Sequence, residues 1–393
     1  MIRRIKVRNF LSLKEVDLKL GLRSLLVGPN MSGKSNLFAC LKFLSTALGA
    51  PDPSGTSGFQ RAIFSLGGFR EVAWKGDDDS TIRIAVAIEI PRGSSEPSKI
   101  YDYEVSLTGS FHNSNLLVES ESLNVVIGSA RQLIFEVKAG RGRWTINGTT
   151  TELNVAYNDR SILEFIGLPD FEGTAFRNLV ATWRFYKLVP PLMRDENRPT
   201  PEKFLNELGA NFSSWLMTLQ TFPKAFARLK QVACDTLPSL SDLLIQPTQL
   251  AAVTVGSLEK NLRRPISIQR MSDGELAFLG LLSLIFAPQE LAAPLYCIEE
   301  PESHLHPHML ETLVEVHRQR QDELGPSAAQ IIATTHSPQL VDKMQIEDLL
   351  VVEKIEGQTR FSRPSDDEEL RALVTRKDLG LGDLWYTGAL SRD

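Results

Sequence analysis

Residues 28–35 read GPNMSGKS, and this octapeptide constrains the fold more than any other stretch of the chain. It fits the pattern G-x-x-x-x-G-K-[ST] at every fixed position. An apolar run ending at Val27 precedes it, and a helically spaced stretch from Ser35 to Leu48 follows it. In that strand–loop–helix context, the backbone amides of a glycine-rich loop close around phosphate groups. The sequence therefore predicts an α/β core with a phosphate cradle.

Two side chains of this loop have distinct expected roles. The Lys34 ammonium would reach the β- and γ-phosphates of a nucleotide, and the Ser35 hydroxyl would bind Mg²⁺. The other loop residues would surround the phosphates with backbone amides. The expected nucleotide contacts are Gly28, Pro29, Asn30, Met31, Ser32, Gly33, Lys34, Ser35 and Asn36.

A second phosphate-sized site is suggested by RMSDGELAF at residues 270–278. Ser272 and Gly274 precede an apolar run, as they would at the start of a helix. With Glu275 three residues later, Ser272 completes a capping box, which orders a helix end. Helix N-termini also attract anions. The motif alone allows both a purely structural cap and a phosphate contact.

Two acids stand at the end of a predicted strand in LYCIEEPESHLHP, residues 295–307. Leu295 to Ile298 is apolar, and ligands of α/β proteins meet the carboxyl ends of such strands. There Glu299 would hold Mg²⁺ through a water, and Glu300 would polarise the attacking water. A strand that simply leads into solvent would carry the same acids.

A histidine ends the following predicted strand. IIATTHSP, residues 331–338, is apolar up to the threonines before His336, and Ser337-Pro338 has the serine cap and first-turn proline of a helix start. We expect His336 at the same sheet edge as Lys34 and Glu300, where it could donate a hydrogen bond to the γ-phosphate. A histidine in this place can also be an ordinary surface residue.

The composition agrees with a globular protein of two or three domains. The chain has 393 residues, 42% hydrophobic and 23% charged, and its net charge of −5 argues against a uniformly basic nucleic-acid coat. Its three cysteines lack paired or metal-like spacing, which suits a reducing compartment. There is no signal peptide core, and no apolar stretch is long enough for a bilayer. We expect a soluble cytoplasmic protein.

Hydrophobic spacing divides the chain into three segments. Residues 1–198 hold the phosphate loop and a β-meander over 80–155, whose short β-branched runs are punctuated by Gly, Asn and Ser. Residues 199–260 are predicted to form a small helical insert, and 261–393 carry the α/β pattern that completes the core. The helical face expected in the insert comprises Phe204, Leu208, Phe212, Leu216 and Leu219.

Two connecting stretches of the first segment are also predicted. Residues 51–60 are rich in Gly, Ser and Pro, which indicates a loop. RNLVATWRFYKLVPPL, residues 177–192, is interpreted as a strand that ends at Pro190 and Pro191.

The order of these signals resembles that of ABC-type ATPase heads of the SMC and RecF kind. More narrowly, it is similar to the compact AAA-labelled (AAA_21-like) ATP-binding proteins of the overcoming-lysogenization-defect group. The likeness is carried by VRNFLSL, GPNMSGKSN, SDGE, IEEPESHLHP and TTHSP. It is close in these five motifs and loose over the rest of the chain.

The resemblance implies a P-loop fold of ABC-ATPase type with an antiparallel β-subdomain, and ATP and Mg²⁺ as cofactors. It also implies that two subunits pack head to tail, as a homodimer or within a higher oligomer. Ser272 and Gly274 would then contact a γ-phosphate held by Lys34 of the partner subunit, a role compatible with the capping box. Lys34, Glu300 and His336 would be catalytic, and Ser35 and Glu299 would serve the metal.

Four departures from the family pattern are visible. Glu299 stands where many relatives have Asp, and its longer side chain could shift the metal. Leu11 replaces an arginine that contacts bases in many SMC-like heads. His306 occupies the place of the D-loop aspartate. No Q-loop glutamine is evident, and position suggests the stretch from Tyr186 to Pro191 in its place.

Two classes of function remain open. One is a DNA-handling or DNA-sensing ATPase of repair or anti-phage defence, and the other is an ATPase that holds a partner protein without touching DNA. The insert 199–260 is too short for a coiled-coil arm. The acids Asp366 to Glu369 indicate a solvated helix start, without the displayed cluster of a TOPRIM-type nuclease. We expect a separate effector, which could be a TOPRIM-like nuclease, and no membrane contact.

Three smaller clusters allow both a structural and a functional interpretation. The histidine cluster precedes a predicted helix, and no acid or cysteine completes a familiar metal-binding spacing around it. The basic and aromatic cluster in the β-meander is expected at a tip between strands, as a solvated hairpin turn or as a nucleic-acid contact. The basic cluster near the helical insert allows the same two interpretations. The clusters are His304, His306 and His308; Arg141, Arg143 and Trp144; and Arg184, Lys187, Arg194 and Arg198.

Overall fold

The chain folds into two compact units, which are described in turn. The first comprises Met1–Trp183 and Glu347–Asp367, and the second comprises Arg184–Ile346 and Glu368–Leu390. These boundaries differ from the three segments expected from the sequence, because the chain leaves the first unit at Arg184 and re-enters it at Glu347. The computed structural model describes residues 1–49, 55–77, 80–91, 96–109, 116–146, 148–155, 158–165, 171–248, 251–376 and 380–390.

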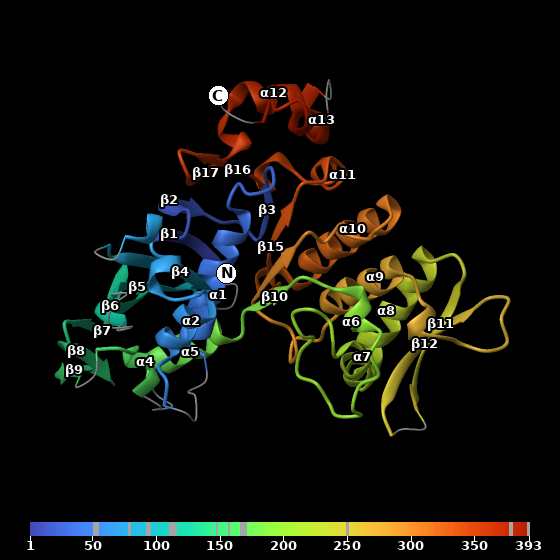
Figure 1. Cartoon of the computed structure of the whole chain (residues 1–393), viewed down its shortest axis with the longest axis horizontal. Coiled ribbons are helices and arrows are strands. Elements are labelled where there is room, and N and C mark those ends of the chain that lie inside the picture. The colour runs from blue at the N-terminus through green and yellow to red at the C-terminus, as the bar shows by residue number, and fades with distance from the viewer. Residues whose placement is uncertain are drawn as a thin grey trace. The chain divides into compact units, whose positions relative to one another are not determined.

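An antiparallel sheet of eight strands forms much of the first unit (Figure 1). Its order is β2-β1-β4-β5-β6-β7-β8-β9, so the β-meander expected over 80–155 is confirmed. Buried side chains alternate with exposed or half-buried ones from Arg4 to Arg8 of β1 and from Ile82 to Glu89 of β4, as a period of two predicts. The strands are β1 (Ile2–Phe10), β2 (Leu13–Lys19), β4 (Ile82–Ile90), β5 (Lys99–Gly109), β6 (Leu116–Ile127), β7 (Ala130–Lys138), β8 (Arg141–Ile146) and β9 (Thr149–Asn154).

Aromatic side chains join this sheet to its helices. Phe10 of β1 lies 5.6 Å from Phe43 of α1, and Tyr103 of β5 lies 4.9 Å from Phe176 of α5, measured between ring centroids. Tilted pairs at such separations add to the stabilisation from burial. The helices are α1 (Lys34–Ala47), α2 (Gly58–Ser65), α3 (Phe69–Val72), α4 (Ile162–Phe165) and α5 (Glu172–Ala181).

Two predictions for the connecting stretches are wrong in part. Helix α2 begins inside the expected loop 51–60, because Ser57 caps it by accepting a hydrogen bond from the Gln60 amide. Residues 51–54 lie outside the described part of the chain. The strand expected over 177–192 is reduced to β10 (Arg184–Tyr186), since the residues up to Ala181 continue α5.

A parallel pair of strands carries the phosphate loop. β3 (Arg23–Val27) pairs in parallel with β16 (Leu349–Ile355), and β17 (Gln358–Ser362) pairs antiparallel with β16. Leu25 to Val27 and Leu349 to Val352 are at most 1% exposed. Their continuous apolar runs are typical of parallel strands that are covered on both faces.

The core of the second unit is a parallel arrangement of β10, β14 (Leu295–Glu299) and β15 (Gln330–Thr335) (Figure 1). α9 (Asp273–Ile285) and α10 (Pro307–Leu324) join β14 in one apolar cluster that includes Leu282, Ile298 and Leu313. The remaining helices of this unit are α6 (Pro190–Met193), α7 (Phe212–Gln220), α8 (Pro223–Thr236), α11 (Pro338–Asp342), α12 (Glu368–Arg376) and α13 (Leu381–Tyr386).

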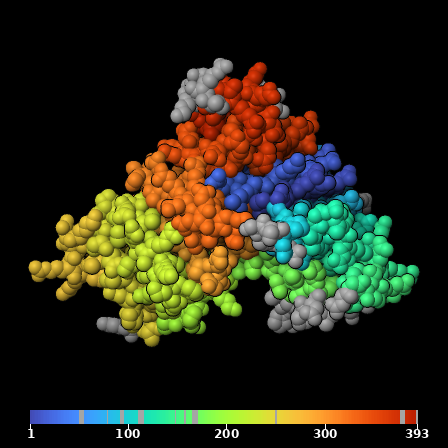
Figure 2. Space-filling model, turned by 180° about the vertical axis from the view of Figure 1, so that it is seen from behind, coloured from blue at the N-terminus to red at the C-terminus, as the bar shows by residue number. Residues whose placement is uncertain are grey.

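The helical insert expected over 199–260 is corrected at both ends. β11 (Leu240–Pro247), β12 (Val253–Glu259) and β13 (Ile266–Ser267) form an antiparallel sheet, whose atoms project in yellow in Figure 2. Among the described residues of this insert, helical structure is confined to α7 and α8.

The expected apolar face of this insert is correct only in its second half. Phe212, Leu216 and Leu219 are buried, whereas Phe204 and Leu208 are each 40% exposed. Residues 199–211 form no helix despite the helical spacing, and Gly209 has a φ of +82°, which is incompatible with a right-handed helix.

No helix in the described part of the chain is both long and apolar enough to cross a membrane.

A buried carboxylate anchors the start of α4 on the large sheet. Glu121 of β6 is 2% exposed, and it accepts hydrogen bonds from Tyr103 Oη at 2.8 Å, Ser161 Oγ at 2.5 Å and the Ile162 amide at 2.8 Å. Burial raises the pKa of Glu121 to about 7, because the three donors offset only part of the cost of removing the charge from water.

We predict that Glu121 makes the first unit less stable as the pH rises. Its pKa in the folded chain, about 7, exceeds the ordinary value of 4.5, so the stability it contributes is complete below pH 4.5 and is lost as the pH rises through 7. The loss is about 3 kcal/mol, at roughly 1.4 kcal/mol per pKa unit. Urea unfolding at pH 5 and 8 should show this loss in the wild type, and Glu121→Gln should lack it. Parallel pH profiles for both proteins would contradict the prediction.

Candidate functional site

The phosphate loop lies in the first unit, between β3 and α1. Gly33 has a φ of +100°, in the left-handed region that glycine tolerates, and α1 begins directly after it. The Lys34 ammonium donates hydrogen bonds to the carbonyl oxygens of Gly28 at 2.6 Å and Pro29 at 2.9 Å. The lysine is therefore folded back over the loop that it is predicted to serve.

Two residues that sequence reasoning does not predict, Ser12 and Thr359, hold the phosphate loop in place. Thr359 of β17 donates through its hydroxyl to the Ser32 carbonyl at 2.9 Å, and its amide donates to the Ser12 carbonyl at 2.8 Å. The two hydroxyl oxygens, on Ser12 and Thr359, are 2.5 Å apart. These residues are 347 positions apart in the chain, so no local pattern could have indicated the contact.

The loop fits a bound phosphate chain. A Cβ on Gly28 would lie 2.3 Å from the Val352 carbonyl oxygen, so glycine is required for this close packing. Ser32 Oγ is buried and has no hydrogen-bond partner among the described residues. A nucleotide phosphate would satisfy that hydroxyl and would replace the carbonyls that Lys34 now contacts. Ser35, the expected ligand of Mg²⁺, is exposed.

The acid pair lies in the second unit, at the carboxyl end of β14. Glu299 is the last residue of the strand, and Lys187 Nζ lies 3.3 Å from its Oε2. Glu300 has a φ of +46°, and its amide donates to the Thr334 carbonyl at 3.1 Å. A left-handed backbone costs a residue other than glycine about 1–3 kcal/mol, and such strain clusters at functional sites.

His336 follows β15 and meets the second acid. Its Nδ1 lies 3.5 Å from Glu300 Oε1. Glu302, which the sequence analysis did not single out, positions the histidine, since its Oε1 accepts from the Thr335 hydroxyl at 2.6 Å and from the His336 amide at 3.3 Å. The structure therefore brings Glu300 and His336 together. The contact of both with Lys34, which belongs to the first unit, stays a prediction.

Ser272 and Gly274 lie at the N-terminus of α9. Ser272 Oγ accepts from the Glu275 amide at 3.2 Å, and Glu275 Oε2 accepts from the Ser272 amide at 2.7 Å, which completes the capping box. Ser272 is nevertheless exposed, so an anion can approach this helix end. A Cβ on Gly274 would lie 2.8 Å from the His304 carbonyl oxygen, so packing also favours glycine there. The structural and the phosphate-binding interpretations remain compatible.

The arginine cluster near α6 is engaged within the second unit. Arg194 donates to the Met271 carbonyl at 2.8 Å and to Asp273 Oδ1 at 2.6 Å, which fixes the turn before α9. The Arg184 guanidinium lies 4.0 Å from the centre of the Phe204 ring. With Lys187 paired to an acid as well, these contacts favour the structural interpretation of the cluster.

The expected basic and aromatic tip in the β-meander is corrected. Arg141, Arg143 and Trp144 lie along β8 and not in a hairpin turn. The Trp144 ring meets Phe171 edge-on at 6.0 Å, and Arg143 lies 3.4 Å from Glu136 of the neighbouring strand. The tryptophan therefore packs within the first unit.

The histidines before α10 also have structural contacts. His306 caps the helix, since its Nδ1 accepts from the His308 amide at 3.3 Å. Within the described residues, no group of three or more His, Cys, Asp or Glu side chains is arranged to hold a metal ion.

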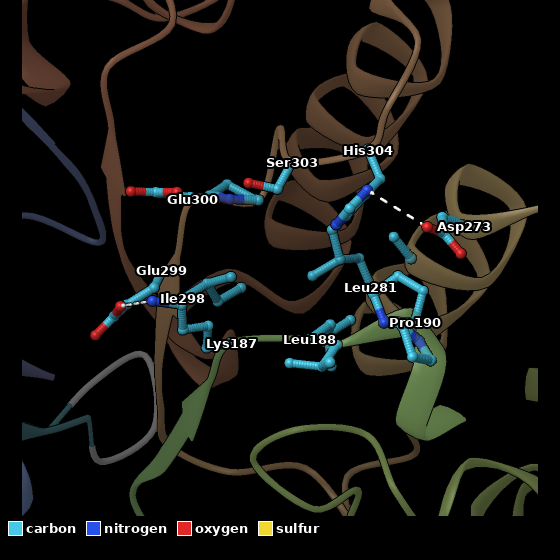
Figure 3. A pocket seen from close by; sticks show the side chains of 14 residues that line it. Lys187, Leu188, Pro190, Asp273, Leu281, Ile298, Glu299, Glu300, Ser303 and His304 are labelled. Atoms are coloured by element: carbon cyan, nitrogen blue, oxygen red, sulfur yellow. Dashed lines mark ion pairs between the residues drawn. The ribbon is translucent and has the colours of Figure 1, made fainter. Parts of the chain in front are cut away.

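A cavity of about 290 Å³ opens beside the acid pair (Figure 3). Its lining comes from the segment after β10, from α9 and from the turn after β14. Leu188, Pro190 and Leu281 supply apolar walls. On the side of the cavity away from the acid pair, His304 Nδ1 lies 3.8 Å from Asp273 Oδ2 (Figure 3). Asp273 is the residue that follows the exposed Ser272 in the sequence.

Comparison with known proteins adds an independent view of this arrangement. The family model described as "AAA domain, putative AbiEii toxin, Type IV TA system" matches residues 138–342, just over half of the chain. A search of curated proteins finds none with significant similarity in sequence.

Solved structures of SMC heads share the fold. The SMC head bound to the C-winged helix domain of ScpA has a TM-score of 0.52 and 14% identity, over 92% of this chain and 96% of that one. The SMC head with an extended coiled coil bound to the C-terminal domain of ScpA, derived from Pyrococcus furiosus, has a TM-score of 0.51 and 11% identity, over 95% and 99%. At these identities the likeness shows the fold alone, and the predicted P-loop ATPase fold is confirmed.

We predict that Lys187 competes with Mg²⁺ for Glu299. The lysine side chain is 60% exposed, so its ammonium can leave at small cost, and an exposed ion pair is worth at most about 1 kcal/mol. Lys187→Gln should lower the Mg²⁺ concentration needed for half-maximal nucleotide binding by up to about fivefold. Titration of Mg²⁺ against a fluorescent ATP analogue measures this.

Lys203→Gln is the matched control, because it removes another exposed lysine of the same unit. It should leave the Mg²⁺ dependence unchanged. An identical Mg²⁺ dependence in the wild type and Lys187→Gln would show that the ion pair does not compete with the metal.

Proposed function

This chain belongs to the AAA_21 family of AAA domains, described as putative AbiEii toxin of Type IV TA systems, and we propose that it is a Mg²⁺-dependent ATPase of the ABC type. Two copies pair head to tail around two nucleotides, and closure of the pair controls a separate effector in DNA repair or anti-phage defence. The observation that carries this proposal is the exposed, pre-organised N-terminus of α9, which offers Ser272 to an anion.

Nucleotide binding begins in the first unit. Lys34 exchanges the carbonyls of Gly28 and Pro29 for the β- and γ-phosphates, and the loop amides surround the same oxygens. Ser35 and Glu299 would hold Mg²⁺, and the ion would neutralise the charge that develops on the phosphates. The Lys187 ammonium would then leave Glu299.

Hydrolysis depends on the second acid. Glu300 orients the attacking water and accepts its proton as general base. His336, whose Nδ1 lies 3.5 Å from Glu300, donates a hydrogen bond to the γ-phosphate. The Glu302 carboxylate keeps the histidine in place by accepting a hydrogen bond from the backbone amide of His336. Glu302 is therefore a positioning residue in this mechanism.

Pairing of the two copies depends on the N-terminus of α9. Ser272 and the amides at the start of α9, including that of Gly274, contact the γ-phosphate held by Lys34 of the partner subunit. The positive end of the helix dipole favours this charge, and the capping box keeps the amides oriented. Hydrolysis removes the shared phosphate, so the pair opens.

A second candidate is a switch that holds a partner protein without direct DNA contact. Two arginines of the large sheet are paired with acids, at 3.0 Å for Arg131 and Asp102 and 3.5 Å for Arg83 and Glu104. Matched charges do not form the basic stripe that nucleic acid requires. Two of the similar SMC heads are named for their complexes with ScpA domains, which supports a protein partner for this chain as well.

Glu300→Gln is predicted to trap the closed pair. The amide keeps the shape of the side chain but cannot accept the proton, so hydrolysis should fall by roughly 10²–10⁴-fold while Mg²⁺-ATP still binds. Uncleaved ATP stabilises the state that binds it best. Light scattering after size exclusion should therefore show twice the monomer mass with ATP and the monomer mass with ADP.

Two variants control this experiment. Lys34→Ala should abolish tight ATP binding and, with it, pairing. Ser272→Arg should keep ATP binding on the phosphate loop but block pairing, because its side chain occupies the place of the γ-phosphate. Normal turnover in Glu300→Gln would remove Glu300 from the mechanism, and a mass independent of nucleotide would count against ATP-gated pairing.

The two candidate functions differ in their response to DNA. If the second is correct, the ATPase rate of the purified protein should change by less than about twofold when duplex or single-stranded DNA is added at low salt, where phosphate contacts are strongest. The protein should also leave the DNA uncut. Strong stimulation by DNA would favour the first candidate, and metal-dependent cleavage by the pure chain would contradict the need for a separate effector.

A further inference from the structure

Met31 is an apolar side chain at the tip of the phosphate loop. The residue is 83% exposed, although Ser32 and Lys34 in the same loop are buried. Its φ of +66° lies in the left-handed region, which strains a residue that carries a Cβ. Single exposed apolar side chains are common. The exposure of Met31 therefore indicates a function only if the loop contacts an apolar site on a second copy when the two copies pair.

The cavity beside the acid pair has the chemistry to receive such a side chain. Leu188, Ala277 and Leu281 form apolar walls, and Asp273 and Ser303 also line the cavity (Figure 3). An unbranched thioether adapts to irregular apolar space better than a branched or aromatic side chain does. At about 290 Å³, the cavity has room for it.

The chain length between the two contacts fits this match. Lys34 is the third residue after Met31, so their Cα atoms are at most about 10 Å apart. Asp273, which lines the cavity, directly follows Ser272. A phosphate held between Lys34 of one copy and Ser272 of the other therefore brings Met31 within reach of the cavity.

We propose that Met31 of one copy inserts into this cavity of a second copy when the pair closes. This inference rests on the head-to-tail pairing proposed above. The apolar contact stabilises the closed pair, and it excludes water from the space beside the two acids. It also explains why a large apolar side chain occupies a strained, exposed position in the loop.

Cysteine crosslinking tests the contact directly. We would combine Met31→Cys with Ser303→Cys in a background that also carries Glu300→Gln and Cys234→Ser. Cys40 and Cys297 are fully buried, and burial raises the pKa of both thiols, so they should not react. A short bismaleimide should link the subunits with ATP and leave them unlinked with ADP. Tyr386→Cys with Ser303→Cys is the control, because Tyr386 is also 83% exposed, and it should give no crosslink.

A cavity-filling variant tests the energetic contribution. Ala277 is 3% exposed and lines the cavity, so Ala277→Leu should occupy part of the space that the methionine needs. The dissociation constant of the ATP-bound pair should rise about tenfold or more, given the usual gain from burying a methionine. The affinity of the single chain for ATP should stay unchanged. Met31→Ala should weaken pairing similarly, and combining it with Ala277→Leu should add little, because both changes remove the same contact.

The outcomes separate the two proposals. If ATP still drives pairing by light scattering, but no crosslink forms and Ala277→Leu pairs normally, the insertion of Met31 is wrong and the pairing proposal stands. If Glu300→Gln never pairs with ATP, the pairing proposal fails and this inference fails with it. Should Ala277→Leu not fold, the crosslink alone decides.

Discussion

The hydroxyl of Thr359 makes the contact on which the phosphate loop depends. It bonds the Ser32 carbonyl and lies 2.5 Å from the Ser12 hydroxyl, so it ties the loop to the turn after β1 and to β17. A Cβ on Gly33 would lie only 1.9 Å from that hydroxyl. Glycine is thus required at this position for packing as well as for its positive φ. The loop can take its shape only after residues hundreds of positions apart have met, which is the slow and costly part of folding.

Local patterns were enough to predict the elements that carry the candidate site. The apolar run before Gly28 gave β3, the Ser272–Glu275 pair gave the start of α9, and Ser337-Pro338 gave the start of α11. Each of these signals acts over a few residues, so tertiary contacts had little chance to override it. Helical spacing is misleading over 199–211, because Gly209 has a φ of +82°, which no right-handed helix contains.

The contacts that position the functional side chains were beyond the reach of sequence reasoning. Lys187 was grouped with nearby arginines as a basic cluster, since composition shows a charge but not its partner. Only the pairing of β10 with β14 places it beside Glu299. Glu302 is likewise an undistinguished acid of a turn until β15 brings Thr335 and His336 against it. Such residues are recognised by what they touch.

The proposed switch divides its energy between two kinds of contact. An apolar contact such as Met31 in its cavity cannot distinguish ATP from ADP, so it sets the baseline affinity of the pair. Only contacts with the γ-phosphate can make the pair more stable with ATP than with ADP, because a ligand shifts an equilibrium by no more than its differential affinity for the two states. Moving a population from 1:99 to 99:1 requires about 5.5 kcal/mol. Hydrogen bonds to a charged group contribute about 1.5–3 kcal/mol each. Two phosphates, each reached by Ser272 and the helix amides of the opposite copy, can therefore supply the difference, provided that the apolar baseline alone is too weak to hold the pair.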